Sequence, residues 1–121
     1  MRLALAALSL VFLSCGVETL SETCSGDQEC NIGCAGGSGC ELRCTDQSIC
    51  RSSCPSGGCT YKCFDQADCE FACSGGGCEI DCFDNARCSV DCVGGNCDFA
   101  CNPGTDCTGT CASDTCVGNG F

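Results

Sequence analysis

Cysteine is the residue type in this sequence that could carry chemistry, because its sulfur can form disulfides, bind metals or act as a nucleophile. The chain has 21 cysteines in 121 residues. Beyond residue 23, pairs spaced Cys-x3-Cys alternate with gaps of four or five residues, and four cysteines make one repeat. We label these four cysteines a, b, c and d. Column a holds Cys24, Cys44, Cys63, Cys82 and Cys101; column b holds Cys30, Cys50, Cys69, Cys88 and Cys107; column c holds Cys34, Cys54, Cys73, Cys92 and Cys111; column d holds Cys40, Cys59, Cys78, Cys97 and Cys116.

The repeat predicts the elements that position these cysteines. Its period is 19 residues from Cys40 onward and 20 in the first unit, and such a period is typical of a solenoid in which each repeat is one coil. Polar residues flank a central, often apolar residue, as in Cys78-Glu79-Ile80-Asp81-Cys82. This alternation places both cysteines and the central residue on one face of a strand. The inward central residues are expected to be Leu42, Tyr61, Ile80 and Phe99 between d and a, and Ile32, Ser52, Phe71, Val90 and Gly109 between b and c.

Two kinds of turn connect the expected strands. Glycine-rich gaps such as residues 55–58 follow column c, and acidic gaps such as Phe64-Asp65-Gln66-Ala67-Asp68 follow column a. Glycine suits a sharp reversal, and Asp, Asn and Gln side chains can hydrogen-bond the backbone of a turn. The sequence therefore predicts a small disulfide-rich all-β fold, a flattened β-solenoid of about five coils with 19–20 residues and four cysteines in each. At about 4.8 Å per rung, the rod would be roughly 24 Å long.

Strand geometry restricts how the cysteines can pair. Two cysteines four residues apart on a strand are about 13 Å apart, beyond the limit of roughly 7 Å between bridged Cα atoms. Pairing along a column would leave one thiol over, because each column has five members. Bridges across each turn, from a to b and from c to d, avoid both problems. The predicted disulfides are Cys24–Cys30, Cys34–Cys40, Cys44–Cys50, Cys54–Cys59, Cys63–Cys69, Cys73–Cys78, Cys82–Cys88, Cys92–Cys97, Cys101–Cys107 and Cys111–Cys116.

Metal binding and catalysis are the alternative uses of reactive side chains. Zinc and iron–sulfur sites usually combine Cys-x2-Cys pairs with histidine, but the chain has no His and its repeats lack such pairs. Without histidine, and without a Gly-x-Ser-x-Gly or phosphate-binding motif, the sequence offers no candidate for acid–base or nucleophilic catalysis. We therefore predict a protein that is not an enzyme and has no resident cofactor.

An acidic column is the most suggestive feature after the cysteines. Asp46, Asp65 and Asp84 recur at 19-residue intervals and should stack about 5 Å apart. Because like charges repel, we expect this column either to splay into solvent or to gather a cation, with calcium as the candidate. The glycine turns and half-coils resemble the calcium-binding β-rolls of secreted repeat proteins, although the Gly-Gly-x-Gly-x-Asp ligand loop of that family is absent. The architecture also resembles the disulfide-braced antifreeze β-solenoids of beetles; their Thr-x-Thr ladder has a counterpart only at Thr108 and Thr110, so ice binding is not expected.

The first residues have the composition of an export signal. The apolar run Leu3–Leu13 is eleven residues long, too short to span a bilayer, and follows a single arginine. The segment Val11-Phe12-Leu13-Ser14-Cys15 resembles the lipobox of bacterial lipoproteins, with Phe12 where leucine is usual. This resemblance implies cleavage before Cys15 and a lipid on its sulfur. Plain cleavage after Gly16 is the alternative, and either event removes Cys15 from the disulfides.

These predictions give a signal peptide (1–14), a lipidated N-terminus with a short tether (15–23), the solenoid (24–116) and a C-terminal tail (117–121). The tail either caps the open strand end or frays, and we favour fraying. The formal net charge of −11 argues against nucleic acid as a partner, whereas a lipid would make the membrane one. Two functions stay open. One is a structural or surface-display lipoprotein, exported and lipid-anchored at the bacterial cell envelope, which we favour over free secretion. The other is an extracellular module that binds a protein, a glycan or calcium.

Overall fold

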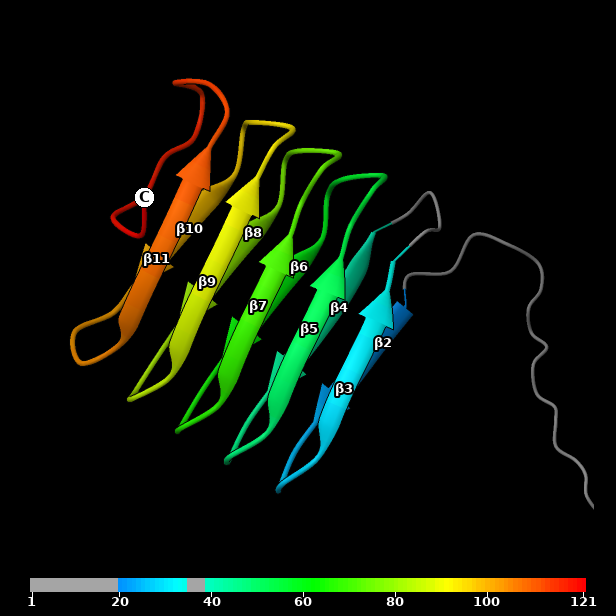
Figure 1. Cartoon of the computed structure of the whole chain (residues 1–121), viewed down its shortest axis with the longest axis vertical. Coiled ribbons are helices and arrows are strands. Elements are labelled where there is room, and N and C mark those ends of the chain that lie inside the picture. Colours follow the sequence, from blue (N-terminus) through cyan, green and yellow to red (C-terminus); the bar gives the residue numbers. More distant parts are fainter. Residues whose placement is uncertain (1–19, 35–38) are drawn as a thin grey trace, which may run out of the picture.

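The computed structural model describes residues 20–34 and 39–121, and these residues form a two-sided β-solenoid (Figure 1). Strands alternate between the two sides of the flattened coil, and turns join them at both edges. No helix in the described part of the chain is long and apolar enough to cross a membrane. The strands within this part are β2 (Leu20–Cys24), β3 (Glu29–Gly33), β4 (Cys40–Cys44), β5 (Ile49–Ser53), β6 (Thr60–Cys63), β7 (Asp68–Ala72), β8 (Glu79–Cys82), β9 (Arg87–Cys92), β10 (Asp98–Cys101) and β11 (Asp106–Cys111).

Both sides of the solenoid are parallel sheets in strict register. The even-numbered strands form one sheet in the order β10-β8-β6-β4-β2, and the odd-numbered strands form the other in the order β11-β9-β7-β5-β3. Each residue pairs with its counterpart one repeat away; Cys63, for example, pairs with Cys44 on one side and Cys82 on the other. The predicted solenoid of about five coils is confirmed, and every sequence column becomes a physical row along the solenoid axis.

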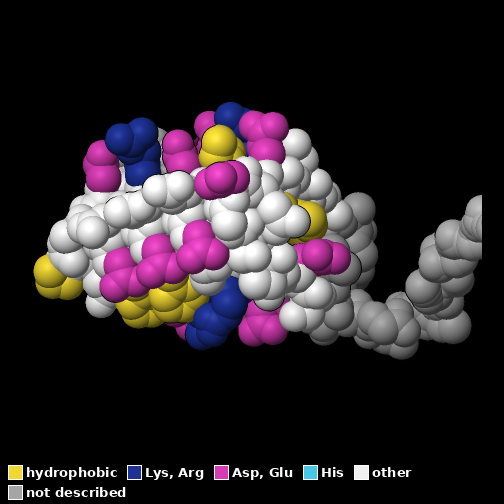
Figure 2. Space-filling model, turned by 90° about the horizontal axis from the view of Figure 1, so that it is seen from below, with side chains coloured by type: hydrophobic (Ala, Val, Ile, Leu, Met, Phe, Trp, Pro, Cys, Tyr) yellow, Lys and Arg dark blue, Asp and Glu magenta, His cyan; other side chains and the backbone are white. Residues whose placement is uncertain are grey.

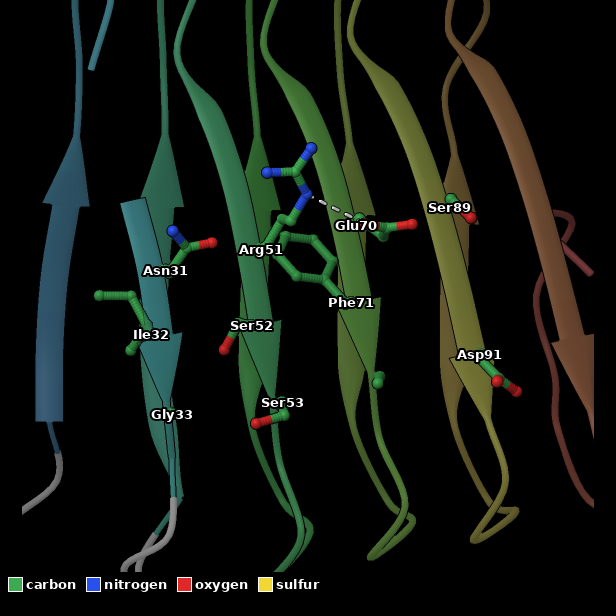
Figure 3. Close-up of a pocket in the computed structure, with 11 residues that line it drawn as sticks. Asn31, Ile32, Gly33, Arg51, Ser52, Ser53, Glu70, Phe71, Ser89 and Asp91 are labelled. Atoms are coloured by element: carbon green, nitrogen blue, oxygen red, sulfur yellow. Dashed lines mark hydrogen bonds and ion pairs between the residues drawn. The ribbon is translucent and has the colours of Figure 1, made fainter. Parts of the chain in front are cut away.

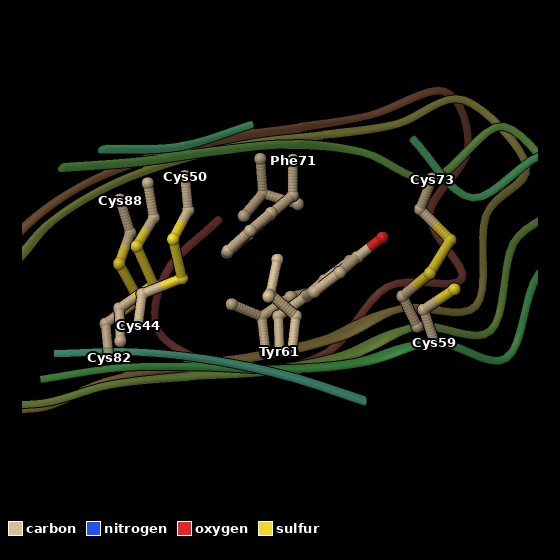
Figure 4. Packing of buried hydrophobic residues seen from close by; sticks show 14 of the residues in the cluster. Cys44, Cys50, Cys59, Tyr61, Phe71, Cys73, Cys82 and Cys88 are labelled. Carbon is tan, nitrogen blue, oxygen red and sulfur yellow. A yellow bond between two sulfur atoms is a disulfide. The ribbon is translucent and has the colours of Figure 1, made fainter. Parts of the chain in front are cut away.

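The core lies between the sheets and is closed at both edges by sulfur (Figure 4). Leu42, Tyr61, Ile80 and Phe99 point inward from the even-numbered strands and are at most 1 % exposed. Phe71 and Val90 face them from the odd-numbered strands, and Ile32 packs against the same cluster while partly exposed. The strand alternation predicted from the Cys-x3-Cys segments thus places the apolar residues between two rows of disulfides.

Each a–b and c–d turn is bridged, and the structure joins the same ten pairs that strand geometry predicts. The Cα atoms of the bridged cysteines are between 5.8 Å and 6.7 Å apart, inside the normal range for a disulfide. In the loop-entropy model, closing a loop this short stabilises the fold by on the order of 2 kcal/mol. The bridges therefore supply the stability that so thin an apolar layer cannot.

Ser52 is a polar residue in the inward row, and its partner lies across the core. The Ser52 Oγ is 3.0 Å from the hydroxyl oxygen of Tyr61, and both side chains are buried. The Tyr61 ring in turn stacks on Phe71, with 3.9 Å between ring centroids and 5° between planes. Burial raises the pKa of the Tyr61 hydroxyl, and the hydrogen bond with Ser52 partly offsets that rise. Ser52 thus gives the buried hydroxyl of Tyr61, the only tyrosine of the chain, a hydrogen-bond partner inside the core.

We expect Ser52 and Tyr61 to be energetically coupled. Ser52→Ala or Tyr61→Phe alone leaves one buried hydroxyl without its partner and should lower the free energy of unfolding by about 1–3 kcal/mol. The double substitution should cost less than the sum of the two, with a coupling on the order of 1 kcal/mol. Guanidinium denaturation of the four disulfide-intact proteins measures this cycle. Strictly additive losses would contradict a hydrogen bond that stabilises the core.

The C-terminal tail, residues 117–121, covers the end of the solenoid. It is paired with β10 and does not fray as we expected. Val117 forms a parallel bridge to Asp98 and accepts a hydrogen bond from the Phe99 N–H (3.0 Å). The Asn119 side-chain amide imitates a further strand: its Oδ1 accepts from the Cys101 N–H (2.7 Å) and its Nδ2 donates to the Cys101 carbonyl (2.8 Å). Backbone groups of β10 that an edge strand would leave open are thereby paired.

Glycines allow the tail to approach this closely. Gly118 has a φ of +103° and passes directly over the Phe99 backbone, where a β-carbon would collide with the carbonyl oxygen. Gly109, at the inward position of β11, leaves room for Phe121, since a β-carbon there would lie 2.8 Å from the Phe121 ring. Phe121 packs edge-on against Phe99, with 5.4 Å between centroids and 80° between planes. The tail is thus a fitted cap over β10.

Deleting residues 117–121 should make the protein associate. The uncovered edge of β10 would present the Phe99 and Cys101 backbone groups to a strand edge of a second copy. Phe121→Ala is the matched control, because it removes the ring contact but keeps the backbone pairing of the cap; it should lower stability without promoting association. Sedimentation velocity over a range of concentrations compares the three proteins. A truncated chain that stays as monomeric as the full chain would contradict this role of the cap.

Candidate functional site

The acidic a–b turns position a row of carboxylates along one edge of the solenoid. Each is a four-residue turn closed by a backbone hydrogen bond, as from the Ala67 N–H to the Phe64 carbonyl (3.1 Å). The second residue of the turn needs a positive φ, and Asp46, Asp65 and Asp84 adopt values of 61°, 60° and 62°. Aspartate tolerates this left-handed conformation better than most residues. Local backbone demand therefore explains an aspartate at this column before any ligand is considered.

The three carboxylates hydrogen-bond the backbone of the preceding coil. The Gly26 N–H donates to Asp46 Oδ2 (2.9 Å), the Asp46 N–H to Asp65 Oδ2 (3.0 Å), and the Asp65 N–H to Asp84 Oδ2 (3.1 Å). Each bond is charge-assisted and offsets part of the repulsion between stacked carboxylates. We call this set the aspartate ladder. The residue types predicted side chains that can hydrogen-bond the backbone of a turn, but not a donor in the preceding coil, because the direction of the N–H groups depends on the turn conformation.

The aspartate ladder ends where the sequence of the turn changes. In the fifth coil, Pro103 and Gly104 replace the aspartate turn, and the Thr105 N–H donates to the Asn102 carbonyl (3.2 Å). Here the positive φ of 93° falls on Gly104 rather than on the preceding residue, the pattern of a type II turn with proline at its second position. This turn supplies no carboxylate to the Asp84 N–H.

An aromatic stack runs beside the aspartate ladder. Phe64 and Phe83 are half-buried and parallel, with 4.8 Å between ring centroids, and the Arg43 guanidinium lies 4.7 Å from the centroid of Phe64. Figure 2, which views the molecule from the side of the a–b turns, shows a row of acidic side chains next to a hydrophobic patch. A hollow of about 550 Å³ follows the ladder and is lined by its aspartates and the neighbouring Gln47, Gln66 and Asn85.

Asp65 has two roles: its carboxylate accepts a hydrogen bond from the Asp46 N–H, and its backbone adopts a positive φ. Substitutions at this position should separate them. Asp65→Asn keeps a carbonyl acceptor and a side chain that tolerates a positive φ, so its stability should stay within about 0.5 kcal/mol of the parent. Asp65→Ala loses the acceptor and keeps a strained β-carbon, which should cost about 1–2 kcal/mol. Asp65→Gly loses the acceptor but relieves the strain, so it should fall between them. Guanidinium denaturation ranks the three. Equal stability for Ala and Asn would contradict the ladder.

The outer face of the odd-numbered strands carries a second hollow, of about 630 Å³ (Figure 3). Its floor is a row of small outward residues, Gly33, Ser53 and Ala72, and Asn31, Arg51 and Glu70 form the next row. We call this surface the outer trough. It arises because parallel register stacks small side chains upon each other and long ones upon each other. The outward positions of three successive repeats carry this pattern in the sequence, where small and long residues recur at 19- to 20-residue intervals.

Ion pairs link the coils beside the outer trough. Arg51 lies between Glu29 (3.5 Å) and Glu70 (3.2 Å), and Arg87 lies between Asp68 (4.0 Å) and Asp106 (3.7 Å). All these side chains are more than half exposed, so the pairs contribute little to stability. They place positive charge between negative charges on an acidic protein, and Arg51 and Glu70 line the trough itself.

Sulfur atoms approach one another closely enough to suggest metal ligation, but they are oxidised. Cys44, Cys50 and Cys69, for example, have sulfurs within 4.8 Å of one another. Because the metal ligand is a thiolate, sulfurs held in the Cys44–Cys50 and Cys63–Cys69 bridges are not ligands. Asp46, Asp65 and Asp84, the calcium candidates, remain together in the aspartate ladder, and calcium binding stays a prediction.

The fold and its cysteine rows define the class of the protein as a small disulfide-rich β-solenoid. The proposed lipidation site Cys15 and the signal peptide lie outside the described residues. No family model, no curated protein and no solved structure matches the chain.

Proposed function

We propose that the protein is a non-enzymatic exported lipoprotein with a structural or surface-display role at the cell envelope. The observation that carries this proposal is the bridge at each a–b and c–d turn of the described coils. So many disulfides indicate an extracellular or otherwise oxidising environment. They also leave few stretches of chain long enough to open without breaking a covalent bond, which suits a rigid module exposed to proteases.

A lipid on Cys15 would connect this module to a membrane. The apolar run before Cys15 has the length of a signal-peptide core, and residues 16–19 would separate the lipid from β2, which begins at Leu20. The negative charge of the chain supports the same arrangement, because an acidic solenoid is repelled by an anionic bilayer and would stand away from it.

The outer trough favours a second candidate function, an extracellular binding module. Arg51, Glu70 and Asn31 offer hydrogen-bond donors and acceptors beside a floor of small side chains, which suits contact with a protein or a glycan. The aspartate ladder would be the calcium site of this alternative; isothermal calorimetry with millimolar calcium distinguishes an ion site from solvated turns.

Intact mass and cell fractionation of the full chain, made in a bacterium that processes lipoproteins, test the proposal. We expect a mature protein that begins at Cys15, carries a diacylglyceryl group and sediments with membranes. Cys15→Ser should abolish the lipid mass and the membrane association while leaving the ten bridges intact. A mature chain that begins at Val17 without lipid would overturn the anchor.

Protease treatment of intact cells tests the structural part of the proposal separately. The oxidised solenoid should survive, and prior reduction of the disulfides should make it sensitive. Rapid cleavage of the oxidised protein would contradict a rigid exposed module.

A further inference from the structure

The rows of disulfides bring the sulfur of one bridge beside the next bridge. In the a–b row, the Cys69 sulfur lies within 4.8 Å of both sulfurs of the Cys44–Cys50 bridge. One coil further, the Cys88 sulfur lies within 4.8 Å of both sulfurs of the Cys63–Cys69 bridge. From the second coil to the fourth, sulfurs of neighbouring coils therefore lie within 4.8 Å of one another.

The c–d row repeats this arrangement at the opposite edge. Its first contact joins Cys59 to the Cys34–Cys40 bridge, again with all three sulfurs within 4.8 Å. Cys54 contacts the Cys73–Cys78 bridge, and Cys73 contacts both Cys92 and Cys97. Because Cys54 and Cys59 are bridged to each other, the contacts continue from the first coil to the fourth.

We propose that each row relays thiol–disulfide exchange between coils inside the folded protein. A dithiol reductant from solution first reduces one bridge, such as Cys63–Cys69, and is itself oxidised to a disulfide. The Cys69 thiolate then attacks the Cys50 sulfur: the Cys50–Cys69 bond forms, the Cys44–Cys50 bond breaks, and Cys44 leaves as a thiolate that takes up a proton. This second step consumes no oxidant or reductant, and it moves a thiol from the third coil to the second.

Burial favours exchange between coils over exchange with solvent. Cys44, Cys50 and Cys63 are fully buried and Cys69 is 1 % exposed, so a dissolved thiol reaches them poorly and the initial reduction is the slow step. A neighbouring cysteine is already inside the core with its sulfur within 4.8 Å, which gives it a high effective concentration. Because the thiolate is the attacking species, the relay should accelerate about tenfold per pH unit until the attacking thiol is deprotonated.

This activity goes beyond the structural role proposed above and does not depend on it. A solenoid with such a relay can lose one bridge and spread the loss along the row, because an inter-coil bond can replace a broken one. Breakage of a bridge then leaves the coils linked and produces thiols at other positions of the row.

The Cys63→Ser variant of the full chain, made together with Cys15→Ser so that Cys69 carries the single thiol, tests the relay without any added reductant. The oxidised variant is incubated at pH 9, quenched with acid, unfolded, alkylated and mapped by mass spectrometry. We expect the alkyl group on Cys44, Cys50 and Cys82 in addition to Cys69, since Cys69 contacts Cys44, Cys50 and Cys88, and attack on Cys88 releases Cys82. Cys63→Ser combined with Cys69→Ser, again with Cys15→Ser, is the control and should take up no label.

A second variant keeps the test decisive if the first is poorly folded. Cys78→Ser, again with Cys15→Ser, frees Cys73 in the c–d row, and the label should then appear on Cys59, Cys92 and Cys97 through attack on Cys54, Cys97 and Cys92. Label confined to the originally freed cysteine, over a time in which the same variant scrambles in guanidinium, would overturn the relay. Label on cysteines of the opposite row in native buffer, such as Cys73 in Cys63→Ser or Cys63 in Cys78→Ser, would also overturn it, because exchange would then proceed through unfolding.

Discussion

Parallel stacking in strict register is the constraint on which the rest of this structure depends. With a 19-residue repeat, each position lies on its own counterpart in the next coil, as Cys82 lies on Cys63 and Cys101. A property at one position is therefore multiplied along the axis, whether it helps or harms the fold. Sulfur benefits from this multiplication, because identical bridges repeat at both edges and close each coil covalently while the apolar layer between them stays thin.

Stacking also brings like charges close together, and the molecule offsets their repulsion locally. The carboxylates of Asp46, Asp65 and Asp84 face backbone N–H groups of the preceding coil, so each negative charge has a donor within its own row. On the outer face, Arg51 and Arg87 alternate with acidic side chains of adjacent coils. A chain with a net charge of −11 can thus stack without requiring an ion at every coil.

The cysteine columns made the fold predictable, because a strand alternates its faces and a disulfide reaches only a short distance. Three features could not be predicted from the residue types and their spacing. The partner of Ser52 is Tyr61, which lies on the opposite sheet, nine residues further along the chain. The aspartate ladder depends on where a turn aims its N–H groups, which residue types alone do not specify. The cap depends on the side-chain amide of Asn119, which hydrogen-bonds Cys101 as a neighbouring strand would. The repeat pattern does not predict this contact.

The outward rows differ from the inward ones in a way that bears on function. Inward positions repeat sulfur and apolar groups, whereas the outward row beside the outer trough runs Asn31, Arg51, Glu70, Ser89 and Thr108. A periodic ligand that followed the axis would meet a different side chain at each coil, so it would gain little from the regular spacing. A partner with an irregular surface, such as a folded protein, suits this face better. A spacer needs no outward regularity at all, which is why the rigid bridged interior supports the structural role more directly than the surface supports binding.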